Sequence, residues 1–498
     1  MFIWFKKRFR LLLEHQSTLS VSYLVYTVAL GFSGVIQLGL LFFLARVLPA
    51  PEFGVVALLM VSIPLVGRLV TSGSDIALAI RIWRRSRIEQ QADLGAVLGW
   101  TGVLVAILVC FVVIGERLVD LAISTPLVLG TLLTAYCRSY SDIFQVMLRR
   151  EGRVARVGIF VIVRAAFFGG FSVAAVLLFG ASAELYLAGV LSAEAVMALF
   201  ALAGMRAIYR VSLLARGSFN RMRELVRVGF PSIPGAAATL LLAAGDRFVI
   251  TGVLGLVAAG IYTLGQRLAE YVVQILFVPF LSAFSPYAHS VASQNQQRAF
   301  AVMGQTALAF AFLGGVVAGF PAIFGREAIM LLAGPEFADA VTVFILVLAA
   351  ALICQLCQIL AGYFTHTEQL RKYMWIIVGA AVANLLLNMV SVRVFGIIGA
   401  AIVSVLVYEG ILISILIMAK SGGVILTSTR RLHIPLFAFF GYLFLIHAVD
   451  ASHYEVPTRI TMKSSLWIAY AILCVAISPE VRDLVYRLSG RVRQFLWH

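Results

Sequence analysis

The stretch GDRFVITGVLGLVAAGIYTLGQRLAE, from Gly245 to Glu270, contains the pattern on which the fold depends. Two apolar segments are joined by a Gly- and Ala-rich turn, which predicts a pair of membrane-spanning helices. A charge near the bilayer midplane costs at least about 2.5–3.5 kcal/mol on insertion scales, so charged residues inside such helices require a reason. This stretch contains four of them: Asp246, Arg247, Arg267 and Glu270.

The composition places this helix pair in a membrane protein. Of the 498 residues, 62% are hydrophobic and only 12% are charged, and the mean hydropathy is +1.00. Soluble domains are about 25% charged. Apolar runs of membrane-spanning length recur along the chain, so the sequence predicts an all-α polytopic membrane protein with about 14 transmembrane helices. The expected spans are 18–45, 53–80, 95–114, 119–147, 157–179, 184–205, 229–253, 257–286, 299–321, 338–364, 373–394, 397–418, 432–448 and 463–479.

The distribution of basic residues predicts the orientation. With a cytoplasmic N-terminus, 28 of the 39 Lys and Arg residues fall in cytoplasmic segments, six in outside loops or at the outer ends of spans, and five deeper within spans. Cytoplasmic loops of membrane proteins are enriched in Lys and Arg, so this bias predicts that both termini are cytoplasmic. The net charge of +16 has the same source and does not indicate nucleic-acid binding. We expect residues 1–17 to be a retained amphipathic start and 480–498 to be a basic interfacial helix.

An internal repeat relates the two halves of the chain. A shift of 206 residues aligns VLPAPEFGVVAL (Val47–Leu58) with VLGLVAAGIYTL (Val253–Leu264). Each segment is the turn between the first two helices of a six-helix unit, and the LFG and VFG sequences that end at Gly180 and Gly396 match further on. Because each unit has an even number of spans, the repeats are parallel, and transporters of this design hold substrate between their halves. The expected parts are an N-lobe (18–205), a cytoplasmic linker (206–228), a C-lobe (229–418) and two further helices (419–479).

The charges within the spans are the candidate functional residues. Such groups face a bundle interior or a water-filled cavity, and they pair with one another where spacing allows. Arg138 and Asp142 are four residues apart, and Arg267 and Glu270 are three apart. Arg68, Ser72 and Asp75 are expected on one face of a continuous second span. Asp246 and Arg247 are adjacent and point about 100° apart on a helix, so each needs a partner on another helix.

Arginine keeps its proton at physiological pH, and its planar fork matches phosphate oxygens. Several arginines converging in one cavity would therefore suit an anionic head group, pyrophosphate in particular, whereas the alternative is that the charges are ion pairs that lock helices together. The candidate cationic cavity comprises Arg68, Arg138, Arg164, Arg247 and Arg267. Candidates for ion coupling or charge balance are Asp75, Asp142, Asp246, Glu270 and Glu409. Gln37, Gln358, Asn384 and Asn388 are candidates either for lining the cavity or for bonding between helices.

Four segments resemble the Wzx-like bacterial polysaccharide flippases of the multidrug/oligosaccharidyl-lipid/polysaccharide exporter superfamily. They are FFLARVLPAPEFGVVAL, VGFPSIPGAAATLLLAAGDRFVITGVLGLVAAGIYTLGQRLAE, LLAGPEFADAVTVFILVLAA and ANLLLNMVSVRVFGIIGAAIVSVLVYEG. The resemblance covers nearly the whole chain, and the four segments follow one another in the family's order. The resemblance implies a multidrug-and-toxin-extrusion-like fold, with two six-helix lobes around a central cationic cavity. Within that cavity only Arg247 falls in a family-like motif, the DRF sequence, and the two extra C-terminal helices depart from the twelve spans of many relatives.

The resemblance also implies a function. It implies transport of undecaprenyl-pyrophosphate-linked oligosaccharide across the bacterial cytoplasmic (inner) membrane, for lipopolysaccharide or exopolysaccharide biosynthesis. The implied partners are the lipid-linked substrate, membrane lipid, and a polysaccharide polymerase and glycosyltransferases. The chain has no GxxxxGK[ST] motif, so a proton or sodium gradient is the expected driving force if transport is driven, and no other cofactor is expected.

Three alternatives remain at this point. One, a purely structural partner in a polysaccharide assembly complex, leaves the charges within the spans unexplained. A multidrug antiporter of the same fold would favour an acidic cavity, and six acids against five arginines deeper within the spans do not decide between the two. A membrane glycosyltransferase or polymerase would need catalytic residues in sizeable outside loops. The outside loops show no paired-carboxylate or metal motif, and we read the C-x-x-C of Cys354 and Cys357 as packing residues rather than a metal site, so we expect a protein that is not an enzyme.

Overall fold

A computed structural model describes residues 18–74, 77–78, 86–118, 124–151, 153–209, 218–229, 233–424, 426–427, 429–452 and 454–477. Within these residues the regular structure is entirely helical, and the chain divides into two compact units, Met1–Phe248 and Val249–His498. The expected amphipathic start, 1–17, and the interfacial helix, 480–498, lie outside the described residues. The predicted lobe boundaries remain a prediction.

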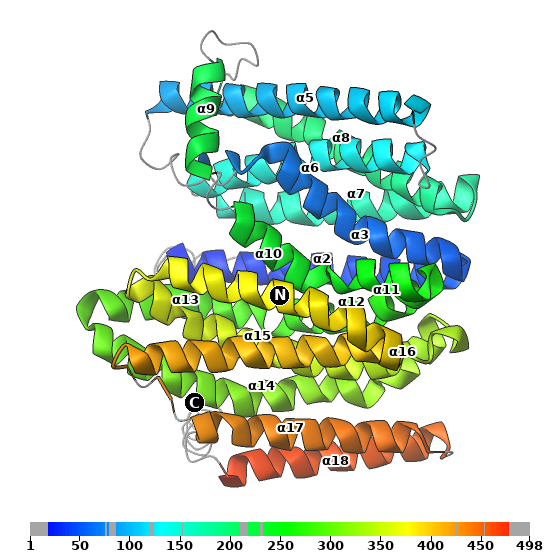
Figure 1. The fold of residues 1–498 in the computed structure, drawn as a ribbon, viewed down its shortest axis with the longest axis vertical. Helices are drawn as coiled ribbons and strands as arrows, with labels where there is room; N and C mark the ends of the chain where they lie inside the picture. The colour runs from blue at the N-terminus through cyan, green and yellow to red at the C-terminus, as the bar shows by residue number, and fades with distance from the viewer. Residues whose placement is uncertain are drawn as a thin grey trace, which may run out of the picture. The chain divides into compact units, whose positions relative to one another are not determined.

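The first unit is built from long helices that pack side by side. Helix α6 contacts α3, α5 and α8, and α7 contacts α2 and α8. The short helix α9 crosses α5 (Figure 1), where Met222 and Leu225 enter the hydrophobic core of this unit. The bounds are α2 Thr18–Val47, α3 Ala50–Thr71, α5 Arg87–Leu118, α6 Thr125–Arg150, α7 Val154–Phe179, α8 Ala183–Tyr209, α9 Ser218–Gly229 and α10 Ile233–Ala244, with α11 (Asp246–Leu254) crossing the boundary between the units.

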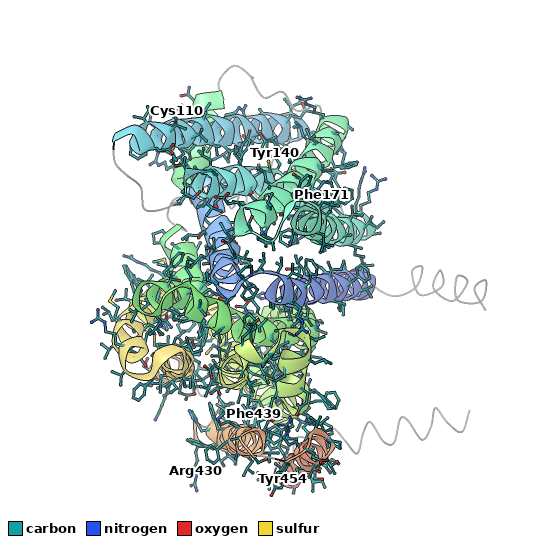
Figure 2. The ribbon with its side chains drawn as sticks, turned by 90° about the vertical axis from the view of Figure 1, so that its right-hand side faces the viewer. Cys110, Tyr140, Phe171, Arg430, Phe439 and Tyr454 are labelled. Carbon is teal, nitrogen blue, oxygen red and sulfur yellow. The ribbon has the colours of Figure 1, made fainter. Side chains whose placement is uncertain are left out.

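The second unit is organised around α15, which contacts α12, α14 and α16. Figure 1 shows α14 beside α17 and α18, and these three helices contact one another. Phe439 of α17, labelled in Figure 2, lies in an aromatic cluster in which Tyr442 and Tyr470 stack with ring centroids 4.9 Å apart. The bounds are α12 Leu256–Leu276, α13 Val278–Gln294, α14 Gln296–Leu332, η2 Pro335–Phe337, α15 Ala340–His366, α16 Leu370–Ser421, α17 Thr429–Asp450 and α18 Val456–Ile477.

The helix boundaries follow the internal repeat. Helix α3 begins at Ala50 and α12 begins at Leu256, which reproduces the 206-residue shift. Gly180 follows α7 with φ 131°, and Gly396 interrupts the 52-residue α16 with φ 62°. Both glycines occupy the left-handed region that disfavours other residues, so each ends one helix of its repeat at the matched position. The predicted all-helical fold with two parallel repeats is confirmed.

The described helices account for the predicted spans. Ten helices are long and apolar enough to cross a membrane, or eleven if the bent pair formed by α10 and α11 counts as one span. One of the ten, α16, covers two predicted spans on either side of Gly396. Helices α6, α12 and α13 also overlap predicted spans but are shorter or less apolar. The protein is therefore a multi-pass membrane protein.

Two predicted boundaries are wrong. The second span was expected to continue to residue 80, but α3 ends at Thr71, where Ser72 adopts a left-handed conformation with φ 49° and Gly73 follows with φ 73°. Arg68 and Ser72 therefore do not share the face of one continuous helix. The last span was expected to begin at Lys463, but α18 begins at Val456, so Lys463 lies inside a helix rather than in a loop.

Candidate functional site

The first unit contains a cavity of about 330 Å³ between α3, α6 and α10, which we call the arginine cavity. Among the described residues, three guanidinium groups line it, those of Arg68, Arg138 and Arg149, together with one carboxylate, that of Asp142. Leu240 of α10 also lines this cavity. The full lining is Pro64, Gly67, Arg68, Thr71, Ala135, Arg138, Ser139, Asp142, Gln145, Val146, Arg149 and Leu240.

One face of α6 provides most of this lining. Its cavity residues are 135, 138, 139, 142, 145, 146 and 149, which recur at the three- and four-residue spacing of a single helical face. The opposite wall comes from the end of α3. A Cβ added at Gly67 would have no heavy atom within 4 Å, so this glycine borders open space rather than a packed neighbour. The polar face that makes α6 less apolar than its neighbours is therefore the face that borders the cavity.

Asp142 joins the cavity to a buried ion-pair network. Arg164 of α7 donates from Nη1 to Asp142 Oδ1 at 2.8 Å and from Nη2 to Glu194 Oε1 at 2.8 Å. Its Nε also donates to both oxygens of Glu194, at 3.2 and 3.1 Å. On the cavity side, Arg138 Nε lies 3.8 Å from Asp142 Oδ2, which confirms the predicted pair but exceeds a hydrogen-bond distance.

The side chains of this network differ in their exposure, which indicates different roles. The side chain of Arg164 is 14% exposed and that of Glu194 is 4% exposed, whereas those of Arg138 and Asp142 are 39% and 55% exposed. Arg164 is not among the residues that line the cavity. It connects α6, α7 and α8, and its donors are directed at two carboxylates. Arg138 instead keeps an accessible guanidinium beside an accessible carboxylate.

The other predicted site residues that the structure describes are not among those that line this cavity. Asp246 and Arg247 are buried at the start of α11, where the Arg247 N–H donates to Asp246 Oδ1 at 2.8 Å. In the second unit, Arg267 Nη1 donates to Glu270 Oε2 at 2.8 Å, as the spacing predicted. Glu409 of α16 pairs with His433 of α17, a partner that the sequence did not suggest. Asp75 lies outside the described residues.

The four uncharged polar candidates also differ in their surroundings. Asn388 donates to Asn384 across one turn of α16 at 3.0 Å, and both are buried. Gln37 donates to Ser33 within α2 at 2.9 Å. Gln358 instead lines a second cavity, which lies in the second unit. Both Asn residues and Gln37 thus bond within their own helices, whereas Gln358 borders a cavity.

Sequence reasoning missed two features. Arg149 was assigned to a cytoplasmic segment, although its position one helical turn beyond Gln145 would have placed it on the cavity face of α6. The second feature is a buried ion cluster in the second unit. Lys463 Nζ donates to Glu327 Oε2 at 2.7 Å and to Asp450 Oδ1 at 2.9 Å, and Arg459 Nε lies 3.8 Å from Glu327 Oε1.

Metal-binding chemistry was not expected from the sequence. Among the residues that the structure describes, no group of three or more His, Cys, Asp or Glu side chains could hold a metal ion. Cys354 and Cys357 are both free thiols, and the Cys357 thiol contacts the carbonyl oxygen of Tyr408 at 3.5 Å.

The fold is similar to that of known membrane transporters. The lipid II flippase MurJ in an inward closed conformation has a TM-score of 0.69 at 13% identity, over 93% of this chain and 100% of that one. An inward-facing multidrug resistance MATE transporter has a TM-score of 0.58 at 15% identity, over 80% of this chain and 94% of that one. For the Vibrio cholerae MATE transporter VcmN the TM-score is 0.53 at 13% identity, over 82% of this chain and 99% of that one. The class is thus a helical membrane protein with the fold of the superfamily that includes the MATE transporters.

The sequence assigns the chain to a family within this class. Residues 21–291 match the family of polysaccharide biosynthesis proteins, and because this match covers more than half of the chain, the protein belongs to that family. The resemblance to polysaccharide flippases of the exporter superfamily is confirmed. The comparison with curated protein sequences gives no match.

Proposed function

We propose that this protein moves an undecaprenyl-pyrophosphate-linked oligosaccharide across the bacterial cytoplasmic membrane by alternating access. The arginine cavity carries the proposal. Three guanidiniums and one carboxylate give the described part of its lining a net charge of +2, and a pyrophosphate diester has two negative charges to match it. Guanidinium groups bind phosphate oxygens through paired hydrogen bonds, which a lysine cannot reproduce.

The family supports the proposed class of substrate. A polysaccharide biosynthesis protein with the fold of a protein named a lipid II flippase is suited to a glycan attached to a lipid. In this proposal the polyprenyl chain stays in the bilayer while the pyrophosphate occupies the arginine cavity. The cytoplasmic orientation of both termini, and the polymerase and glycosyltransferases as partners, are part of the same proposal. The protein needs no catalytic group for this role.

A multidrug antiporter is the competing function. Organic cations bind cavities in which carboxylates predominate, and this cavity has three arginines to one aspartate. The lining therefore favours an anionic ligand over a cationic drug. A proton or sodium ion remains the proposed driving ion if transport is driven. Among the acidic residues, Glu409 is the candidate for this role that we favour, because it pairs with His433 of α17.

The proposal predicts that single arginines in the cavity are required. Arg68→Ala and Arg138→Ala should each lower polymer export by about tenfold or more, because a charge-assisted hydrogen bond contributes about 1.5–3 kcal/mol. Export is measured by complementation in a cell that depends on the polymer, with protein levels in the membrane measured in parallel. The control is Arg223→Ala, at an exposed position on α9. Normal insertion with undiminished export in both cavity variants would contradict the proposal.

A variant that keeps every charge provides a second test. Because the space beside Gly67 is open, Gly67→Leu should fill part of the arginine cavity without displacing a neighbour. We expect lost export at normal expression. Gly441→Leu is the matched control, since Gly441 on α17 also borders open space and lines no described cavity. Equal export by the two glycine variants would indicate that the arginine cavity is not used.

A further inference from the structure

The second unit contains a cavity of about 420 Å³ bordered by α13, α15 and the start of α16. We call it the histidine cavity, because an imidazole from each of two helices borders it: His289 of α13 and His366 of α15. Among the described residues, no Asp, Glu, Lys or Arg lines it. Its other polar lining residues are Ser285, Gln358, Thr365 and Tyr373.

The polar groups of this cavity are held by their surroundings. The rings of His289 and His366 meet edge to face, with centroids 4.8 Å apart and planes at 76°. Gln296 at the start of α14 donates to the carbonyl oxygen of His366 at 2.7 Å, which fixes the end of α15. Together the imidazoles, hydroxyls and carboxamide offer both donors and acceptors of hydrogen bonds.

The rest of the wall is apolar and partly aromatic. Phe284 stacks on Phe280 with ring planes 6° apart, and Tyr373 lies against Phe364 with ring centroids 5.4 Å apart. Both cavity-lining rings therefore have a neighbour that restricts their orientation. Met303 packs beneath, close enough to Gly362 that an added Cβ there would meet its sulfur at 3.1 Å. The cavity combines fixed aromatic faces with uncharged hydrogen-bonding groups.

These features are suited to a sugar ring rather than to a phosphate. A hexose presents hydroxyl donors and acceptors around its edge and an apolar C–H face, and it has no charge that needs a counter-ion. The volume lies within the range of about 300–1,000 Å³ that is usual for small-ligand sites. A phosphate would instead favour arginine, as in the first unit. We propose that the histidine cavity binds a neutral sugar residue of the transported glycan, an inference that rests on the proposed function.

Protection of the two histidines from chemical modification tests this site. The full chain in lipid nanodiscs is treated with diethyl pyrocarbonate, and modification of His289 and His366 is measured by mass spectrometry. The probes are undecaprenyl diphosphate alone and the same lipid bearing one glucose, galactose or N-acetylglucosamine. We expect at least one sugar-bearing lipid to reduce modification of both histidines to less than half, while the sugar-free lipid leaves it unchanged. His447, half-buried on α17 and outside the cavity, is the internal control.

Two outcomes would overturn the inference. One is equal protection by the sugar-free lipid, which would mean that the site holds the diphosphate or the lipid chain. The other is no protection by any of the three sugar-bearing lipids. Binding of pyrophosphate to wild-type protein and to Arg138→Ala is measured alongside. If pyrophosphate binding depends on Arg138 while the histidines stay unprotected, only the proposed sugar site is wrong. If pyrophosphate binding does not depend on Arg138 and the histidines also stay unprotected, the proposed function is wrong as well.

A filling variant keeps the test independent of histidine chemistry. Ala361 lines the histidine cavity, so Ala361→Phe should occupy part of it. We expect slower translocation of the sugar-bearing lipid and unchanged binding of pyrophosphate. Ala448→Phe, at an exposed position on α17, is the control for the added ring. Wild-type translocation by Ala361→Phe, at normal thermal stability, would contradict the proposed site.

Discussion

Asp142 is shared between two arginines that have different surroundings. Arg164 lies behind it and already contacts Glu194 with two of its nitrogens, while Arg138 lies beside it at the longer distance of 3.8 Å. Asp142 therefore contributes a negative charge to the cavity. Arg164 does not depend on this carboxylate alone, because it also contacts Glu194. An entering phosphate would compete with Asp142 for Arg138. Sequence spacing predicted the Arg138 contact, but the contact with Arg164 depends on how α6 and α7 pack.

At this scale we predict that Asp142→Asn strengthens anion binding. Removing the carboxylate raises the net charge of the cavity lining, and an exposed ion pair contributes up to about 1 kcal/mol, so pyrophosphate should bind about two- to fivefold more tightly. Titration calorimetry on the purified protein, repeated at raised salt, measures this change. Glu116→Gln, at an exposed position on α5, should leave the affinity unaltered. Weaker binding by Asp142→Asn would show that the carboxylate supports the site rather than competing in it.

Hydrophobic runs and the 206-residue repeat predicted the type and order of the helices, because lipid requires long, internally bonded apolar segments. The breaks within spans were harder to predict. The Ser72-Gly73 pair is a local turn signal that averaging over an apolar window conceals, and α3 ends there. Lys463 suggested a loop because a lone lysine is unfavourable in a membrane helix. Its cost is offset by Glu327 and Asp450, which lie 136 and 13 residues away in sequence.

That cluster leads to a prediction about the helices it joins. Lys463→Met would leave Glu327 and Asp450 without the cation between them, and breaking a buried ion pair costs about 3–5 kcal/mol. A thermal unfolding measurement should show a clearly lowered Tm. Adding Asp450→Asn to the same chain removes the uncompensated charge and should restore part of the loss, since Arg459 remains beside Glu327. An unchanged Tm in Lys463→Met would mean that the cluster does not stabilise the packing of α14, α17 and α18.

At the scale of the whole molecule, the two repeats share a helix plan but differ in the chemistry of their cavities. The first unit lines its cavity with arginine, and the second lines its cavity with uncharged polar and aromatic groups. Sequence analysis named Arg68 and Arg138 as candidates, and both line the arginine cavity. It could not separate them from Arg164, because pairing with Glu194 arises only when α7 and α8 pack together. A glycan joined to pyrophosphate has this same division into a neutral part and an anionic part.

Translocation of a glycolipid in proteoliposomes tests the central claim most directly. Undecaprenyl diphosphate bearing a radiolabelled sugar is placed in the vesicle membrane, and its appearance on the opposite leaflet is followed with a membrane-impermeant glycosidase. Efflux of a cationic dye is measured from vesicles of the same preparation. We expect glycolipid translocation by the wild-type protein, its loss in Arg138→Ala, and no dye efflux. Dye efflux without glycolipid translocation would contradict the account and assign the protein to the drug transporters.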